Sequence, residues 1–354
     1  MSLKMHLPPL DVSVYPVVTM AHGRYGGSGR PAPTSSNVPN SPDFSSVQKL
    51  VRHVLRSSRV TVQQVERLQG RLHQVYLVRI ADGGMLMLKC PPPFNTRLLR
   101  HEQRGIDTEA KIVELLAANT QLPVPHCIRH DPQGGSFGSP YLMLSYIPGI
   151  ALAEIAPRLS PSERRVVDHT LGAYVRNIAS LTAPRFGTTH RVLSGTGSAT
   201  WREAFLSLLE SVLRDAEDML VSIPYDSIRY YVAWHGYLLE EITQARLVPL
   251  DVGGPENVLV DDCTRQVCGL LGFSNAIWGD PMMAAVFTNA SEAFYEGYGE
   301  CPARTGPAHV RQLLYSVYRA VVAVVTHHYR PQYANHELEA RRSLTWALNQ
   351  LSQV

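Results

Sequence analysis

The sequence is poor in lysine and has no long apolar run. The only lysines are Lys4, Lys49, Lys89 and Lys111, so most of the 33 basic residues are arginines. Basic and acidic residues are interspersed and the net charge is only +3, which excludes the basic stripe that nucleic-acid binding needs. The longest apolar stretch, near 320–325, is far shorter than the roughly 20 residues of a membrane span. We therefore expect neither a nucleic-acid partner nor a membrane partner.

Cysteine is also scarce. The chain has five cysteines without CxxC spacing, which gives no indication of a disulfide framework or a zinc site; they are Cys90, Cys127, Cys263, Cys268 and Cys301. The first residues lack the continuous apolar core of a signal peptide. These absences favour a cytoplasmic location. Nothing in the sequence indicates an oligomeric state.

The bulk composition is that of a folded protein. Hydrophobic residues make up 45% and charged residues 18% of the 354 residues, values typical of globular chains long enough to bury a core. Residues 21–46 instead concentrate Gly, Pro and Ser, a composition that cannot offset its ordering entropy by burial. We expect residues 1–46 to form a flexible segment and the fold to begin at residue 47.

Hydrophobic periodicity changes along the chain. Alternating β-branched and apolar residues predict an antiparallel sheet with a hairpin turn at Asp82, Gly83 and Gly84, preceded by a short amphipathic helix at 47–55. Helical spacing predicts a helix at 106–120, and 141–149 reads as a strand. Beyond residue 149 the pattern is mostly helical, at 165–181, 201–220, 227–242 and 310–329. The fold class is therefore α+β, with a β-rich part at 47–148 and an α-rich part at 149–354.

Over roughly residues 50–340 the order of segments resembles the aminoglycoside phosphotransferase and choline kinase family. The resemblance implies a two-lobed, protein-kinase-like fold with a small antiparallel N-lobe and a larger helical C-lobe. Lys89 in MLMLKC is similar in position to the strand lysine that holds nucleotide phosphates, and Glu109 in DTEAK to the helix glutamate that pairs with it. A lysine fixed by a carboxylate presents a positioned charge to a phosphate. We expect these two side chains to lie within ion-pairing distance.

The stretch LVPLDVGGPENVLVDD, residues 247–262, resembles the catalytic loop of that family. The resemblance implies that Asp251 is the base or orienting carboxylate for a substrate hydroxyl and that Asn257 is a magnesium ligand. Two features depart from the family pattern. Pro249 replaces the usual histidine, and Asn257 follows Asp251 by six positions where the family has five.

The stretch VCGLLGFSNAIWGDP, residues 267–281, resembles the metal-binding strand of the family, with Asp280 at the place of its structural aspartate. Gly272 stands where the family has the aspartate that is its principal magnesium ligand. The loop that covers the phosphates contains a single glycine, Gly70, and therefore lacks the repeated glycines typical of such loops. We expect no metal site, with Asn257 as the only remaining ligand-like residue. Lys89 and Glu109 would be a vestigial nucleotide pair, and no cofactor is expected.

Aromatic residues are frequent in the helical part. They favour a largely apolar small-molecule substrate, although aromatic residues at helical spacing also form cores. The residues proposed as catalytic or shape-setting groups are Asp251, Asn275, Trp278, Tyr237 and His235.

Three functions remain open. The main prediction is a metal- and ATP-independent catalyst of secondary metabolism, such as a cyclase, a pericyclase of the Diels-Alder type or an isomerase, which needs a shaped pocket and no nucleotide. The alternative is an active small-molecule O-kinase that uses ATP and magnesium with ligands relocated to, for example, Asp251, Asp261 or Asp262. The second alternative is a non-catalytic pseudokinase that binds a small molecule.

Overall fold

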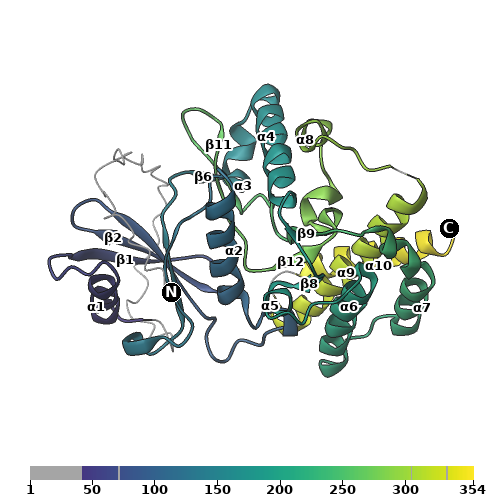
Figure 1. The fold of residues 1–354 in the computed structure, drawn as a ribbon, viewed down its shortest axis with the longest axis horizontal. Helices are drawn as coiled ribbons and strands as arrows, with labels where there is room; N and C mark the ends of the chain where they lie inside the picture. The colour runs from purple at the N-terminus through teal and green to yellow at the C-terminus, as the bar shows by residue number, and fades with distance from the viewer. Residues whose placement is uncertain (1–41, 71, 304, 332–333) are drawn as a thin grey trace, which may run out of the picture.

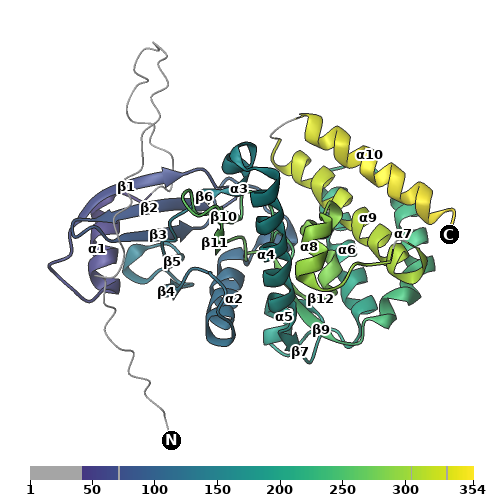
Figure 2. The ribbon, with the colours of Figure 1, turned by 90° about the horizontal axis from the view of Figure 1, so that it is seen from above.

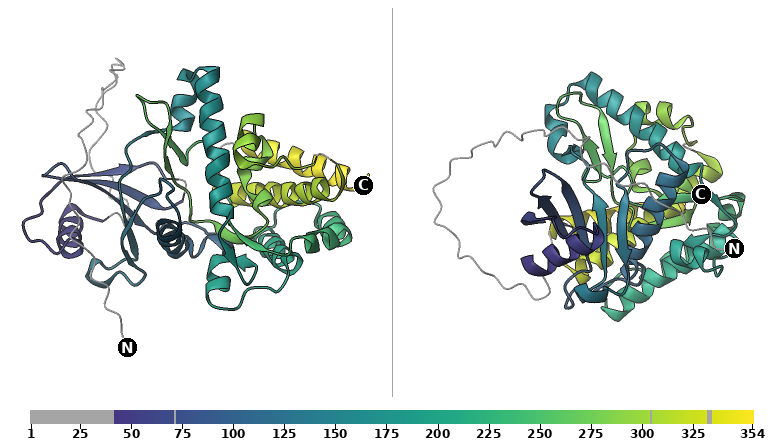
Figure 3. Two further views of the ribbon diagram at one scale, coloured as in Figure 1. Left: turned by 45° about the horizontal axis from the view of Figure 1, so that its top comes forward. Right: turned by 60° about the vertical axis from the view of Figure 1, so that its left-hand side comes forward.

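The computed structural model describes residues 42–70, 72–303, 305–331 and 334–354. Of the segment 1–46 that was expected to be flexible, residues 1–41 lie outside this part of the chain, and the first helix already begins at Phe44. The described residues form the expected two-lobed, protein-kinase-like α+β fold, with a sheet lobe beside a larger helical lobe (Figure 1). The same division is visible from two further directions in Figure 3. Within the described ranges, no helix combines the length and the apolar character needed to cross a membrane.

The sheet lobe contains five antiparallel strands in the order β1-β2-β3-β5-β4. The predicted hairpin and the predicted first two helices are present, whereas the edge strand β4 was not predicted. Figure 2 shows α2 between the sheet and the helical lobe. The elements of this lobe are α1 (Phe44–Val54), β1 (Val62–Leu68), β2 (Gln74–Ile80), β3 (Met85–Cys90), η2 (Arg100–Glu102), α2 (Gly105–Asn119), β4 (Cys127–Asp131), η3 (Gly135–Phe137) and β5 (Tyr141–Ser145).

Alternation along β3 decides which side chains reach the centre of the molecule. Leu86, Leu88 and Cys90 are buried in a cluster with α1 on one face of the sheet. Successive side chains of a strand point to opposite faces, so Met87 and Lys89 lie on the other face. Met87 packs there against the large core that includes α2. Lys89 is thereby directed toward α2.

The helical lobe contains the four predicted helices and four α-helices that were not predicted, at Leu152–Ile155, Thr189–Leu193, Glu292–Tyr298 and Ala334–Leu351. The predicted helix at 227–242 is α-helical only to His235 and continues as a 3₁₀ turn, and α10 was not predicted separately from α9, along which it packs. The elements of this lobe are β6 (Ile150–Ala151), α3 (Leu152–Ile155), η4 (Ala156–Arg158), α4 (Pro161–Ala179), β7 (Thr182–Ala183), β8 (Gly187–Thr188), α5 (Thr189–Leu193), α6 (Trp201–Asp218), α7 (Tyr225–His235), η5 (Gly236–Glu241), β9 (Ala245–Pro249), β10 (Val258–Val260), β11 (Val267–Leu270), β12 (Ala276–Gly279), η6 (Pro281–Met283), η7 (Ala285–Thr288), α8 (Glu292–Tyr298), α9 (Gly306–Tyr329) and α10 (Ala334–Leu351).

Two small sheets hold the loops that face the sheet lobe. Their strand orders are β11-β10-β6 and β7-β9-β12-β8. At their ends, Leu250 N–H donates to the Asn275 carbonyl over 3.1 Å, and Leu271 N–H donates to the Asn257 carbonyl over 2.8 Å. The loop at 250–257 and the segment at 271–275 therefore lie side by side.

The large aromatic residues of the helical lobe mostly form its core. Trp201, Phe205 and Tyr315 are almost completely buried and pack against one another, with ring centroids 5.5–6.3 Å apart. The same core continues through α2 to the inner face of the sheet. The two lobes therefore share one apolar core, and a second cluster lies between α1 and the outer face of the sheet.

Candidate functional site

A cleft of about 530 Å³ lies between the lobes. The sheet lobe contributes Val75, Met87 and Lys89, and the helical lobe contributes the loop at 250–257 and the segment at 271–275. The chain that connects the lobes, 144–149, forms a further wall. Lys89, Glu109, Asp251, Asn257 and Asn275, which come from four separate segments of the sequence, all line this one cavity.

The expected contact between Lys89 and Glu109 is present. Lys89 Nζ lies 2.5 Å from Glu109 Oε1, and the Glu109 side chain is only 3% exposed. Burial of Glu109 follows from the inward face of α2, which also carries Ile106, Ala110 and Val113. This contact is a charge-assisted hydrogen bond, and it fixes the lysine ammonium at the cleft wall.

Asn257 occupies the space above Gly272. Gly272 has a φ of +85°, and a Cβ atom there would lie 2.5–2.9 Å from the atoms of the Asn257 amide group. Asn257 Nδ2 also donates to the Asp251 carbonyl over 3.0 Å. The glycine and the lengthened loop are therefore adapted to each other, because any side chain at position 272 would have to displace Asn257.

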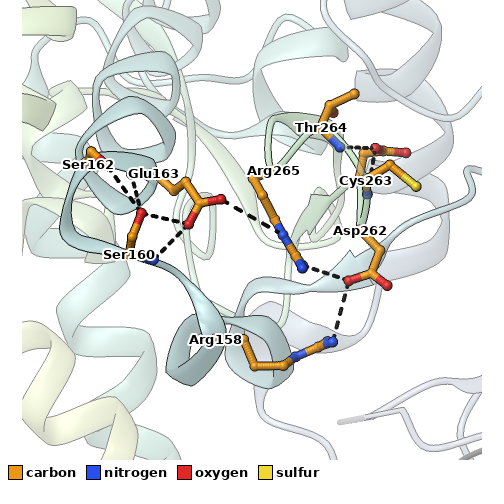
Figure 4. Close-up of polar contacts among 9 residues, drawn as sticks. Arg158, Ser160, Ser162, Glu163, Asp262, Cys263, Thr264 and Arg265 are labelled. Atoms are coloured by element: carbon orange, nitrogen blue, oxygen red, sulfur yellow. Dashed lines mark hydrogen bonds and ion pairs between the residues drawn. The ribbon is translucent and has the colours of Figure 1, made fainter.

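The acidic residues of the second hypothesis separate into two groups. Asp251 lines the cleft, but Asp261 and Asp262 do not. Asp261 accepts hydrogen bonds from backbone N–H groups in the turn between β10 and β11. Asp262 pairs there with Arg158 at 3.4 Å and with Arg265 at 2.6 Å (Figure 4). Glu256 lines the cleft instead and was not singled out from the sequence.

The donor atoms present fit magnesium that is bound together with a nucleotide. No group of three or more His, Cys, Asp or Glu residues in the described part of the chain is arranged to hold a metal ion. Magnesium needs fewer protein ligands, since it is usually bound by one or two carboxylates together with phosphate oxygens and waters. Asp251, Glu256 and the amide oxygen of Asn257 are oxygen donors of this kind on the cleft wall.

The other proposed catalytic residues are dispersed. Asn275 lines the cleft. Trp278 is buried in β12, where its Nε1 has no hydrogen-bond partner. His235 is buried at the end of α7, with Nε2 2.9 Å from the Leu351 carbonyl oxygen. Tyr237 lies on the surface with 58% of its area exposed. The structure thus does not bring Trp278, His235 or Tyr237 to the cleft.

The walls of the cleft contain few aromatic side chains. Among the described residues that line it, Tyr146 is the only Phe, Tyr or Trp. Tyr230 and Trp234, two aromatic residues of the helical part, are instead exposed on α7. Periodicity could not distinguish a core, a surface and a pocket position, because all three occur at the same helical spacing.

Two histidines that the sequence analysis did not single out also line the cleft. Burial lowers the pKa of His73, although the Glu109 carboxylate opposes this shift. Burial likewise lowers the pKa of His101, whose Nδ1 is buried without a hydrogen-bond partner. No local pattern marks these residues, since His73 stands in the loop before β2 and His101 in η2, which is too short to show a periodicity.

His101 is held in place by ion pairs of its neighbours. The Arg100 guanidinium bonds to Asp215 and, at 2.8 Å, to Asp218 on α6. Glu102 accepts from Arg330, just beyond the end of α9, at 2.5 Å and 2.9 Å. Segment η2 therefore connects the sheet lobe to two helices of the other lobe, with His101 between its two anchors.

Asp280 is a structural residue, as the sequence suggests. It is 2% exposed and accepts hydrogen bonds from Tyr315 Oη at 2.7 Å and from Met282 N–H at 3.0 Å. Tyr315 in turn accepts from Trp201 Nε1 at 2.9 Å. Burial raises the pKa of Asp280. This chain of bonds joins the end of β12 to α9 and α6.

Solved structures similar to this chain include proteins assigned as kinases. A protein assigned as a fructosamine-3-kinase from Haemophilus somnus 129PT has a TM-score of 0.62 at 14% identity, over 88% of this chain and 98% of that one. A protein assigned as an aminoglycoside phosphotransferase from Ralstonia eutropha JMP134 has a TM-score of 0.62 at 11% identity, with the same coverage. An aminoglycoside phosphotransferase in complex with AMP-PNP and hygromycin B has a TM-score of 0.61 at 15% identity, over 86% and 98%. A search of curated proteins found no match.

One prediction from the sequence is wrong. The chain was expected to use no cofactor, but the family model that matches it describes phosphotransferases, and similar structures contain AMP-PNP or ATP. The missing aspartate at Gly272 is therefore not sufficient ground to exclude a nucleotide.

The model of the phosphotransferase enzyme family matches residues 64–304, more than half of the sequence. The chain belongs to the phosphotransferase enzyme family.

Proposed function

We propose that the protein is an ATP-dependent phosphotransferase that phosphorylates a hydroxyl group of a small molecule. The observation that carries this proposal is that the Lys89–Glu109 pair of the sheet lobe and Asp251 of the helical lobe line the same cleft. Residues 47–148 would be the nucleotide-binding lobe and residues 149–354 the lobe with the catalytic loop. This is the O-kinase hypothesis, which the comparisons favour over the cyclase hypothesis.

The cleft offers a place for each part of the nucleotide. Apolar side chains of Val75, Met87 and Leu259 would enclose the base beside the connecting chain at 144–149. The Lys89 ammonium would hold the phosphates, since its position is fixed by Glu109. Magnesium bound by Asp251, Glu256 and Asn257 would neutralise negative charge on the phosphate oxygens.

The residues of this chain account for the transfer itself. Asp251 would accept the proton of the acceptor hydroxyl as its oxygen forms a bond to the γ-phosphorus of ATP. The bond from that phosphorus to the bridging oxygen breaks, and ADP leaves with the electron pair. Lys89 remains bound to phosphate oxygens during this exchange and stabilises their charge.

The acceptor is proposed to be a largely uncharged, partly apolar molecule. The cleft is also lined by His101, on which the Asp251 carboxylate acts, and by Val322 and Thr326 of α9. The charge of Arg330 is already compensated by Glu102. Two of the carboxylates that line the cleft, Glu102 and Glu109, are paired with Arg330 and Lys89, which disfavours a polycation. The cytoplasm, where ATP is available, is the proposed location, and the five free cysteines agree with it.

A pseudokinase is the second candidate, and Gly272 is the observation that favours it. Without a side chain at this position, the magnesium ligands are limited to Asp251, Glu256 and Asn257. A protein of this kind would bind nucleotide and acceptor without transferring phosphate. Binding and transfer must therefore be measured separately.

The experiment uses AMP-PNP for binding and ADP release for transfer. We expect Lys89→Met to weaken AMP-PNP binding by about tenfold or more, the scale of a lost charge-assisted hydrogen bond. Asp251→Asn should retain AMP-PNP binding and lower the transfer rate by about 10²-fold or more. The matched control is Lys111→Met, because Lys111 also lies on the sheet lobe but is 57% exposed. A wild-type protein that binds no AMP-PNP would contradict both candidates.

A further inference from the structure

His73 connects three segments of the cleft. It precedes β2, at the end of the loop that follows β1, and its ring lies against the first residue of α2. A Cβ atom on Gly105 would lie 2.8 Å from His73 Cε1 and 3.0 Å from Nε2, and 3.5 Å from Ser274 Cβ. Only a glycine at position 105 leaves this space open. The imidazole therefore lies where the loop, α2 and the segment at 271–275 meet.

The hydrogen-bonding capacity of this ring is unused within the described chain. The structure gives His73 no hydrogen bond or ion pair to a described residue, although its side chain lines the cleft. The charged groups that act on it are Glu109 from α2, Lys89 from β3 and Glu102 from η2. A phosphate bound at Lys89 would thus be close enough to act electrostatically on His73, as Lys89 does.

The loop between β1 and β2 has too few glycines to bind phosphates through its backbone alone. Glycine-rich loops bind phosphates through backbone N–H groups that approach closely. Here Gly70 is the single glycine between β1 and β2, and a Cβ atom on it would lie 2.5 Å from the His73 carbonyl oxygen. The loop therefore folds onto itself at Gly70, and His73 is a side-chain donor at its end.

We propose that His73 contacts the β- and γ-phosphates of the nucleotide and takes up a proton when they bind. This inference rests on the proposed function. Burial lowers the pKa of His73 and thereby favours the neutral imidazole in the free protein. A nearby anion favours the charged imidazolium, so the proton enters from solvent as the phosphates arrive. Nucleotide affinity consequently rises as the pH falls through the range in which histidine titrates.

The test is calorimetry of AMP-PNP binding in buffers that differ in ionisation enthalpy, between about pH 6 and pH 8. The wild type should take up more protons than His73→Gln, a difference in which the ionisation of AMP-PNP itself cancels. His73→Gln should bind AMP-PNP about tenfold more weakly at the lower pH, the scale of one charge-assisted hydrogen bond. AMP, which lacks the β- and γ-phosphates, should bind both proteins equally. His53→Gln, an exposed histidine on α1, is the control.

A second variant removes the contact without removing the histidine. Gly105→Ala should displace the ring and reproduce the effect of His73→Gln, and circular dichroism checks that both variants are folded. The inference is overturned if AMP-PNP binds the wild type but His73→Gln keeps the same affinity and proton uptake. It is also overturned if His73→Gln weakens AMP as much as AMP-PNP. Absence of AMP-PNP binding to the wild type would instead refute the proposed function, and this inference with it.

Discussion

At Gly272 a backbone requirement and a side-chain position coincide. The φ of +85° lies in the left-handed region that favours glycine. Asn257 fills the volume into which a side chain would project. Restoring the family aspartate at this position therefore requires Asn257 to move, and an added carboxylate alone would not recreate the usual magnesium site.

We predict that Gly272→Ala destabilises the protein more than Gly83→Ala does. Both glycines have a positive φ, +85° and +91°, but a Cβ atom on Gly83 would meet nothing within 4 Å. Backbone strain of about 1–3 kcal/mol is common to both variants, and only Gly272→Ala adds the collision with Asn257. Urea denaturation measures the two free energies of unfolding. Equal losses would mean that Asn257 moves aside without cost.

The buried histidines predict a pH dependence of stability. Burial lowers the pKa of His101 below its ordinary value of 6.5, so the unfolded chain binds more protons than the folded one below that pH. The contribution to stability is fully present above pH 6.5 and is lost as the pH falls toward the lowered pKa. We expect His101→Gln to lose less unfolding free energy than the wild type between about pH 7.5 and pH 5.5. Urea titrations at both pH values measure these losses, with His53→Gln as the control. The prediction is contradicted if His101→Gln loses as much unfolding free energy as the wild type.

At the scale of elements, the ion pairs of η2 attach the sheet lobe to the helical lobe beside the cleft. Its two anchors differ in environment. Glu102 and Arg330 are 14% and 16% exposed. In the other anchor Asp215 is buried, but Arg100 and Asp218 are 41% and 58% exposed. Removing one partner of an ion pair that is shielded from solvent costs folding free energy, because the other charge is left buried and unpaired. The Glu102–Arg330 pair should therefore dominate the attachment of η2 to α9.

We predict that Arg330→Ala lowers the free energy of unfolding by roughly 3 kcal/mol, as expected when one member of a buried pair is removed. Arg202→Ala is the matched control, since its pair with Glu240 is exposed, at 38% and 54%, and should cost at most about 1 kcal/mol. A double variant with Glu102→Gln should cost less than the sum of the two single changes. Additive losses would show that the pair does not stabilise the attachment.

On the scale of the whole molecule, the shared core makes the lobes one unit. The large apolar cluster includes residues of α2, of β5 and of most helices of the other lobe. We expect elements that share a contiguous core to unfold as one cooperative unit. The division into lobes is therefore visible in the cleft but not in the packing.

We predict that both lobes unfold in one transition. All four tryptophans follow residue 200 and report on the helical lobe, while Cys90 is 2% exposed beneath α1 and reports on the sheet lobe. In a variant whose other cysteines are replaced by serine, the urea midpoints from tryptophan fluorescence and from thiol labelling of Cys90 should coincide. Earlier labelling of Cys90 would show that the sheet lobe opens separately.

Much of the fold follows from the sequence, but less of the site does. Period-two alternation predicted β1, β2 and β3, and helical spacing predicted α2, α4, α6 and α9. The edge strand β4 was missed because it is only half-buried and carries no clear alternation. Glu256, His73 and His101 were missed because they belong to irregular segments whose place depends on distant contacts.

From the sequence, periodicity determined a β-rich part followed by an α-rich part, and the resemblance to the phosphotransferase family predicted the two lobes and the pairing of Lys89 with Glu109. Only the tertiary structure decided which polar groups share the cleft and which aromatic residues form the core. It also decided that Asn257 lies over Gly272. The physical reason is that burial and close approach arise between segments far apart in the chain, where no local periodicity can indicate them.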